Sequence, residues 1–285
     1  MQTFVYSMLA AALYGTGLVT TYCGLRHMQE LAGARVSIPS AALLFWLLSP
    51  WIDWPAWQAQ AVAIFALVGL FYPAVVTLLT FAGNRRLGPT VAGTIGSTTP
   101  LFAVLGAAAF LGEALGAREL VATTSIVLGT MALSRPAAGV TAIPPRSALW
   151  MPWSAALLRS IAQVLSKAGL ALWPNPFAVA LVSYSVSVVI VWTAGAFAPV
   201  RSAPAFTRRG VAWFALTGVL NGAAVLSMYY ALTTGPVNAV APVVATYPLF
   251  TLALSAALLR QQRLSGRLMG GVVLTVAGIA ILLVR

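Results

Sequence analysis

Ten apolar runs follow one another along this chain of 285 residues, and short polar corners rich in Arg, Gly and Pro separate them. A helix needs roughly 20 apolar residues to cross about 30 Å of hydrocarbon. Its backbone groups are paired internally, whereas an open strand would leave them unpaired in lipid. The pattern therefore predicts ten transmembrane helices, near 4–24, 36–51, 60–82, 89–111, 117–134, 149–171, 177–198, 211–231, 236–258 and 265–284.

Two segments half a chain apart read almost alike: TTPLF at 98–102 and TYPLF at 246–250. An internal duplication in so apolar a chain is typical of a transporter built from two structural repeats. The longest linker carries Pro136, Pro144 and Pro145, which disfavour continued helix. We therefore expect repeats at 1–136 and 149–285, joined by a linker at 137–148.

Each predicted repeat holds five spans, and an odd number makes the second repeat enter the membrane in the opposite sense. The expected fold class is an all-α integral membrane protein of ten transmembrane helices, arranged as two inverted five-helix repeats. Two spaced glycine pairs, Gly218 with Gly222 and Gly266 with Gly270, predict close helix contacts.

Composition excludes several classes of protein. The chain is 60% hydrophobic and only 7% charged, and its mean hydropathy is +0.93, whereas soluble domains are about 25% charged. The net charge of +12 lies in short corners rather than along a basic stripe, so we expect no nucleic-acid partner. One cysteine, Cys23, leaves no intrachain disulfide or multi-cysteine metal cluster. The first run lacks a basic n-region and is expected to remain as a span.

The chain resembles the ten-helix EamA branch of the drug/metabolite transporter superfamily over essentially its whole length. The resemblance depends on the run from Pro100 to FLGE at 110–113, the following span up to Gly129, and a weaker second copy from Pro248 to Gly278. The second copy departs from the pattern, because Arg260 and Gln261 replace the usual Gly-Glu. The resemblance implies export of amino acids or other small metabolites from a cavity between the repeats, with both termini cytoplasmic.

Positive residues give a different orientation. Corners after odd-numbered spans carry most of the Arg residues, and the positive-inside rule places those corners in the cytoplasm. Both termini would then lie outside. The charge pattern and the family resemblance thus predict opposite orientations in a bacterial-type inner membrane.

Arg159 is the sharpest candidate for a binding residue, because it falls about ten residues into the span 149–171. A charge at the bilayer centre costs about 2.5–3.5 kcal/mol, so it should face a wet cavity or a partner. All four acids are expected in corners, which leaves a substrate carboxylate as a partner for the guanidinium. The alternative is that Arg159 snorkels to an interface or binds backbone carbonyls.

The proline motifs are expected to kink their helices at Pro100 and Pro248 and to line a site between the repeats. The alternative is that the threonine hydroxyls beside the two prolines only form hydrogen bonds to their own helix backbone. Together with Arg159, the candidate substrate-binding residues are Tyr14, Tyr72, Thr98, Thr99, Gln163, Asn221, Tyr230, Thr246 and Tyr247.

These features predict a secondary transporter that exports a small metabolite, an amino acid first, by alternating access. It would be monomeric, with the lipid bilayer and a small-molecule substrate as its partners and with no cofactor or metal. A carrier of phosphorylated or nucleotide-linked sugars or of other organic anions is the alternative within this class, and such cargo usually needs two or more cavity cations. A polytopic membrane enzyme is the alternative from another class. One His and four corner acids argue against it.

Overall fold

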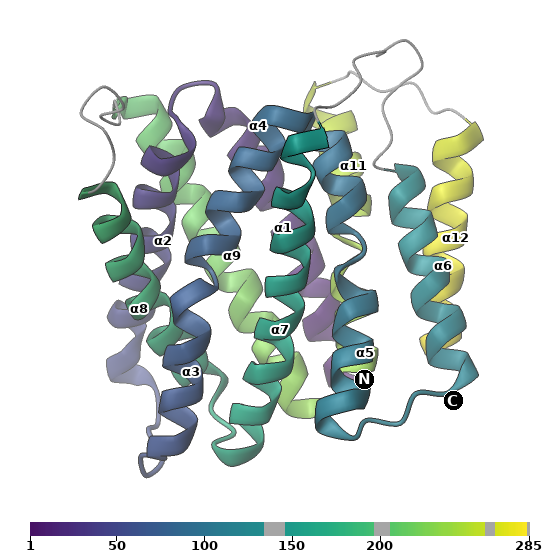
Figure 1. Ribbon diagram of the computed structural model, residues 1–285, viewed down its shortest axis with the longest axis horizontal. Helices are drawn as coiled ribbons and strands as arrows, with labels where there is room; N and C mark the ends of the chain where they lie inside the picture. The colour runs from purple at the N-terminus through teal and green to yellow at the C-terminus, as the bar shows by residue number, and fades with distance from the viewer. Residues whose placement is uncertain (134–145, 197–205, 260–265, 284–285) are drawn as a thin grey trace.

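The computed structural model describes residues 1–133, 146–196, 206–259 and 266–283, and every regular element in these ranges is helical (Figure 1). Eight helical stretches among these residues are long and apolar enough to cross a membrane, and α5 is a shorter apolar helix. The helices are α1 (Gln2–Leu25), α2 (Glu30–Leu48), α3 (Ala59–Phe71), α4 (Ala74–Gly96), α5 (Thr99–Leu111), α6 (Ala117–Leu133), α7 (Trp150–Leu172), α8 (Pro176–Ala196), α9 (Arg208–Thr234), α10 (Val237–Val244), α11 (Tyr247–Leu259) and α12 (Gly266–Leu283). Two 3₁₀ turns, Ser49–Trp51 and Arg146–Ala148, accompany them.

The second predicted span begins earlier than expected, because α2 starts at Glu30 and Arg35 lies inside it. A carboxylate in the first turn suits the positive end of the helix dipole. Arg35 tolerates its place in an apolar helix because its Nε donates to Val191 O at 3.3 Å and its Nη2 to Trp192 O at 3.0 Å. Its guanidinium also lies 5.2 Å from the centre of the Trp192 ring. The predicted span 36–51 left Arg35 in the preceding corner, and that placement is wrong.

Three predicted spans are interrupted rather than continuous. The span 60–82 breaks at Tyr72 and Pro73, between α3 and α4. The spans 89–111 and 236–258 break before α5 and before α11. Pro100 and Pro248 each stand second in the new helix, where a missing N–H costs nothing. The two prolines therefore start helices, and the expected kinks within continuous helices are replaced by breaks.

The chain rises across the molecule through α3 and α4 and descends through α5, so the reversal falls within the range of α4 (Figure 1). In the same view α2 and α8 lie at one end of the molecule and α6 and α12 at the other (Figure 1). Between these ends, α1 packs against α9, α10 and α11, while α7 packs against α3, α4 and α5. Helices from the first and second halves of the chain are thus interleaved.

Glycines allow two of these helix pairs to approach closely. A Cβ on Gly218 would collide with the Ser37 carbonyl oxygen, and one on Gly222 would lie 2.9 Å from Ala41 Cβ, so this predicted contact is found between α9 and α2. The other predicted pair, Gly266 and Gly270, faces open space. The residue after it, Gly271, packs against α6 instead, so the expected contact is displaced by one position.

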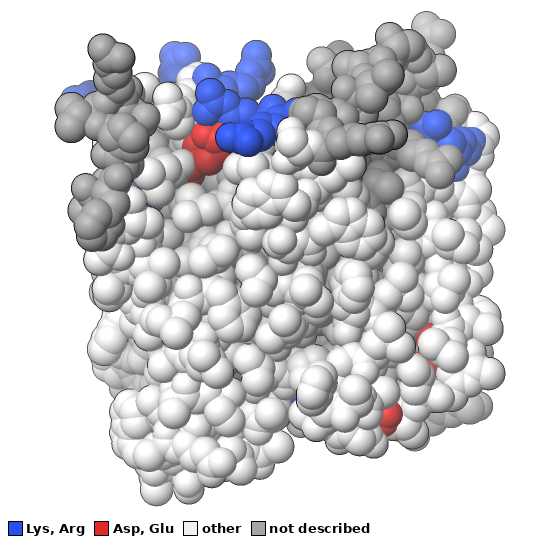
Figure 2. All heavy atoms as spheres, viewed as in Figure 1, with Lys and Arg blue, Asp and Glu red and all other residues white. Residues whose placement is uncertain are grey.

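Charge is divided between the two edges of the helix layer. Lys and Arg side chains gather along the upper edge in Figure 2, while both termini lie in the lower part of Figure 1. Arg85 Nη1 of α4 and Glu30 Oε2 at the start of α2 form an ion pair of 2.8 Å. The basic edge is therefore the one opposite the termini, as the alternation of Arg-rich corners predicts.

Candidate functional site

A hydrogen-bonded pair of phenols connects two distant parts of the chain. The hydroxyls of Tyr14 on α1 and Tyr72 at the α3–α4 break are 2.8 Å apart. Tyr72 is buried, and Tyr14 is partly exposed. Because Pro73 follows it, Tyr72 takes an extended backbone conformation that ends α3. The break therefore directs a phenol toward α1.

Arg159 on α7 lies beside this pair. Its guanidinium lies within electrostatic range of Tyr14, Tyr72 and Tyr247, and its Nη2 donates a long hydrogen bond of 3.4 Å to Thr80 Oγ1. Arg159 is the tenth residue of the 23-residue helix α7, which places it near mid-depth. The structure therefore brings one residue each from α1, α4 and α11, together with Tyr72 from the break, near Arg159 of α7.

The two proline motifs also meet near this position. The Tyr247 hydroxyl lies 3.6 Å from where a Cβ on Gly96 would be, and Gly96 is the last residue before the break that precedes α5. A Cβ on Gly15 would lie 2.7 Å from Tyr247 O, so α1 touches the start of α11 directly. The helix breaks and Arg159 therefore belong to one polar region between the halves of the chain.

The threonines of the motifs use their hydroxyl protons locally. Thr98 donates to Ile95 O, Thr99 to Gly96 O and Thr246 to Val243 O, each at 2.7 Å. All three residues are buried. These bonds satisfy carbonyls that the helix breaks release, and the hydroxyl lone pairs remain available as acceptors.

The remaining predicted residues lie in different places. Gln163 is one turn below Arg159 on α7; its Nε2 lies 3.6 Å from Met228 Sδ, and its Oε1 is buried without a partner. Asn221 on α9 packs against Gly17 of α1 and is partly exposed. Tyr230 stacks on Tyr6 with ring centres 5.4 Å apart.

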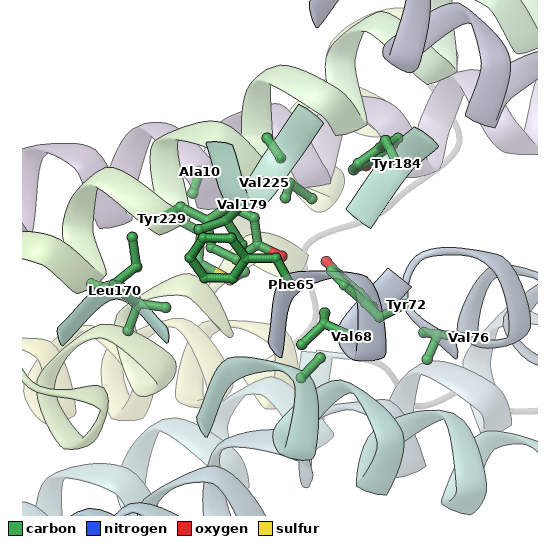
Figure 3. Packing of buried hydrophobic residues seen from close by; sticks show 14 of the residues in the cluster. Ala10, Phe65, Val68, Tyr72, Val76, Leu170, Val179, Tyr184, Val225 and Tyr229 are labelled. Carbon is green, nitrogen blue, oxygen red and sulfur yellow. The ribbon is translucent and has the colours of Figure 1, made fainter. Parts of the chain in front are cut away.

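Two buried tyrosines escaped the sequence analysis. Tyr184 on α8 and Tyr229 on α9 lie within electrostatic reach of the Tyr72 hydroxyl. Figure 3 shows all three in the core of alanine, valine and phenylalanine side chains. Tyr229 also lies close to Ser166 of α7, but neither hydroxyl has a partner in hydrogen-bonding geometry. A tyrosine in an apolar run does not reveal its depth or its direction, so sequence offered no signal for them.

All four acids of the chain lie away from Arg159. Glu30 pairs with Arg85, and Asp53 is exposed in the segment between the first 3₁₀ turn and α3. Both remaining acids lie at the α5–α6 corner: Glu119 accepts from Gly116 N of that corner, and Glu113 accepts from the first two amides of α10. Arg159 therefore has no carboxylate partner among the residues that the structure describes.

The fold and this site define a polytopic helical membrane protein with a guanidinium, that of Arg159, near several tyrosines at mid-depth. The EamA-like transporter family model matches residues 2–135 and 146–284, so the chain belongs to the EamA-like transporter family of membrane proteins. No curated protein matches the sequence. A solved structure described as "Crystal structure of protein" is similar with a TM-score of 0.79 at 17% identity, over 98% of this chain and 95% of that chain. At that identity the likeness shows the fold alone.

Proposed function

We propose that the protein is a secondary carrier that exports a small metabolite, an amino acid before other cargo, across the bacterial inner membrane by alternating access. The moving parts are two inverted five-helix halves, 1–136 and 149–285, joined by the linker 137–148. Family membership supports a transport function, and the charge of the site supports a cargo that carries an anionic group. The observation behind this proposal is that Arg159 lies near mid-depth and that none of the four acidic side chains pairs with it.

A substrate carboxylate supplies what Arg159 lacks. The guanidinium can bind a carboxylate with two parallel N–H···O bonds, and a water-poor site strengthens that interaction. Tyr14, Tyr72 and Tyr247 present hydroxyls that donate to the same carboxylate or accept from an ammonium group. Gln163 Oε1 adds an unpaired acceptor one turn away. Such a set of groups suits a zwitterion better than a purely apolar or cationic molecule.

A phosphorylated cargo fits the site less well, because the second cation of α7, Lys167, is already engaged elsewhere. Lys167 is already bound to two backbone carbonyls, at 2.6 Å from Leu232 O and 2.8 Å from Gly235 O. Arg159 would then face a dianionic phosphate alone. Carboxylate cargo fits one guanidinium, so amino acids and monocarboxylates come first in the test.

The test uses purified protein in proteoliposomes with a panel of amino acids and their decarboxylated amines. Replacing Arg159→Ala removes charge-assisted bonds worth about 1.5–3 kcal/mol each, so affinity for the carboxylate cargo should fall by about 10-fold to 150-fold per bond lost. Arg85→Ala, at an exposed ion pair, is the matched control and should transport normally. Unchanged uptake of amino acids by the Arg159→Ala protein would refute the assignment.

The charge distribution also favours one orientation. The basic upper edge faces the cytoplasm under the positive-inside rule, which places both termini outside, opposite to the orientation that the family resemblance implies. A C-terminal alkaline phosphatase fusion, which is active only outside the cytoplasm, tests this. An inactive fusion combined with an active cytoplasmic reporter at the same position would reverse the orientation.

A further inference from the structure

Glu113 joins two distant corners of the chain at the lower edge. Its Oε1 accepts from Val237 N at 2.8 Å and its Oε2 from Asn238 N at 3.0 Å, so one carboxylate holds both amides at the start of α10. In return, Asn238 Nδ2 donates to Ala114 O at 2.8 Å. A carboxylate suits the positive end of a helix. The α5–α6 corner is thereby attached to the helix that leads into the second proline motif.

Lys167 of α7 holds the same α9–α10 corner from the other side. Its ammonium donates to Leu232 O and Gly235 O, which are among the last carbonyls of α9 and its C-cap. A cation at a helix C-terminus complements the dipole there. Glu113 also interacts electrostatically with this ammonium. The corner is therefore fixed by an anion on its free amides and by a cation on its free carbonyls.

A row of polar groups leads from Arg159 to this corner along one face of α7. Gln163 and Ser166 follow at the spacing of successive turns, and Lys167 comes next. Gln163 Oε1, Ser166 Oγ and, from α9, Tyr229 OH are buried, and within the described parts of the chain none of them makes a hydrogen bond of good geometry, although Tyr229 lies close to Ser166 and Ser183. Most buried polar atoms in proteins are paired, so three poorly satisfied ones in a row suit a segment that water or cargo reaches when it opens.

Burial differs between the level of Arg159 and the lower corner. Tyr14, Thr80 and Asn221 are partly exposed, whereas Leu232 and Val237 at the lower corner are fully buried. The structure is thus closed between the Arg159 site and the edge that carries the termini.

We propose that Glu113 and Lys167 form a gate at this edge, and that the face of Gln163, Ser166 and Tyr229 is the closed segment of the transport route behind it. The inference rests on the proposed carrier function. Opening detaches the α9–α10 corner from the α5–α6 corner, frees the two α10 amides and two α9 carbonyls to water, and lets cargo or water reach the three unpaired atoms. Glu113 acts here as a positioning residue, because it binds backbone amides and does not touch the Arg159 site.

The gate is tested by thiol labelling, which needs no substrate. The full-length protein carries Cys23→Ser and Ser166→Cys, so that a small water-soluble thiol reagent reports access to the closed segment. Replacing Glu113→Ala in this background should raise the labelling rate by at least about tenfold, the factor that corresponds to ~1.4 kcal/mol in the opening equilibrium. Lys167→Met should shift the rate in the same direction. Glu119→Ala is the matched control, because Glu119 binds Gly116 N within its own corner at 3.0 Å.

Each outcome decides the proposal. Faster labelling with Glu113→Ala and Lys167→Met, but not with Glu119→Ala, supports the gate. Equal labelling in all variants, or an equal rise with Glu119→Ala, overturns it. If Glu113→Ala does not yield a monodisperse protein, Glu113→Gln replaces it. The amide oxygen of Gln still accepts from one backbone N–H, so the labelling rate should rise by a smaller factor. No rise in the labelling rate overturns the proposal. Because the readout is independent of cargo, loss of the Arg159 assignment would leave this result intact.

Discussion

The contact between α6 and α12 gives a sharp prediction, because two glycines in it have opposite surroundings. A Cβ on Gly129 would lie 2.7 Å from Thr275 N and 2.8 Å from Gly271 O, both backbone atoms of the facing helix. A Cβ on Gly270 would meet nothing within 4 Å. Gly129→Ala must therefore push α12 outward, whereas Gly270→Ala adds a methyl group on an open face.

The magnitude follows by comparing the two variants. Replacing Gly by Ala within a helix gains about 0.8–1.0 kcal/mol of helix propensity at either position. Overpacking of a close contact costs about 1–3 kcal/mol and applies to Gly129 alone. The propensity gain cancels in the comparison, so Gly129→Ala should be less stable than Gly270→Ala by about 1–3 kcal/mol.

Reversible unfolding in mixed micelles with increasing denaturing detergent measures this difference. Gly270→Ala is expected to match or exceed the stability of the unmodified protein, and Gly129→Ala to fall below Gly270→Ala. If the two variants agree within about 0.5 kcal/mol, the ordinary spread for surface substitutions, the close approach of α6 and α12 is refuted. A loss confined to Gly270→Ala would show that the contact lies on the other face of α12.

Two further experiments test local features. The first is a double-mutant cycle of Tyr14→Phe and Tyr72→Phe, measured by unfolding in detergent. The coupling energy should be about 0.6 kcal/mol and at most ~1.7 kcal/mol, as for other hydrogen bonds between membrane helices. If the two losses of stability are additive, the 2.8 Å bond contributes nothing. Gly112 has φ of 65° with open space around it. Gly112→Ala should therefore lower the free energy of unfolding by about 1–2 kcal/mol through backbone strain alone. Gly112→Asn should lower it less, because Asn tolerates the left-handed conformation. Equal stability of the two variants would contradict this explanation.

The apolar pattern could predict the fold to a large extent because lipid imposes a length and a backbone pairing rule on every span. It failed where a tertiary contact satisfies a polar group. The second span was predicted to begin at residue 36, which left Arg35 in a corner, yet Arg35 lies inside α2 and donates hydrogen bonds to the carbonyls of Val191 and Trp192. The break at Tyr72 was missed because a single proline in an apolar run is equally compatible with a bent continuous helix.

The residues of the candidate site, too, could be predicted from the sequence only in part. Arg159 could be singled out from sequence because a charge in an apolar span is expensive wherever it points. Its neighbours could not be assigned with equal certainty, since Tyr14 and Tyr72 meet only through the packing of α1 against the α3–α4 break. Tyr184 and Tyr229 carry the same chemical groups and were passed over, because hydropathy does not distinguish a tyrosine that faces lipid from one that faces a helix bundle.

Glu113 shows how the placement of acids decides what the central site can bind. Sequence analysis located it at a membrane–water corner, and the structure commits both of its oxygens to the start of α10. Had this carboxylate, or any of the other three, stood within a few ångströms of Arg159, the pair would be neutral and would attract no anion. With all four acidic side chains away from it, Arg159 keeps its positive charge, whose burial is opposed by about 2.5–3.5 kcal/mol until an anion arrives. Under the proposed function, an anionic group on the cargo, such as the carboxylate of a zwitterion, would remove that cost, whereas a cargo without an anionic group would leave it in place.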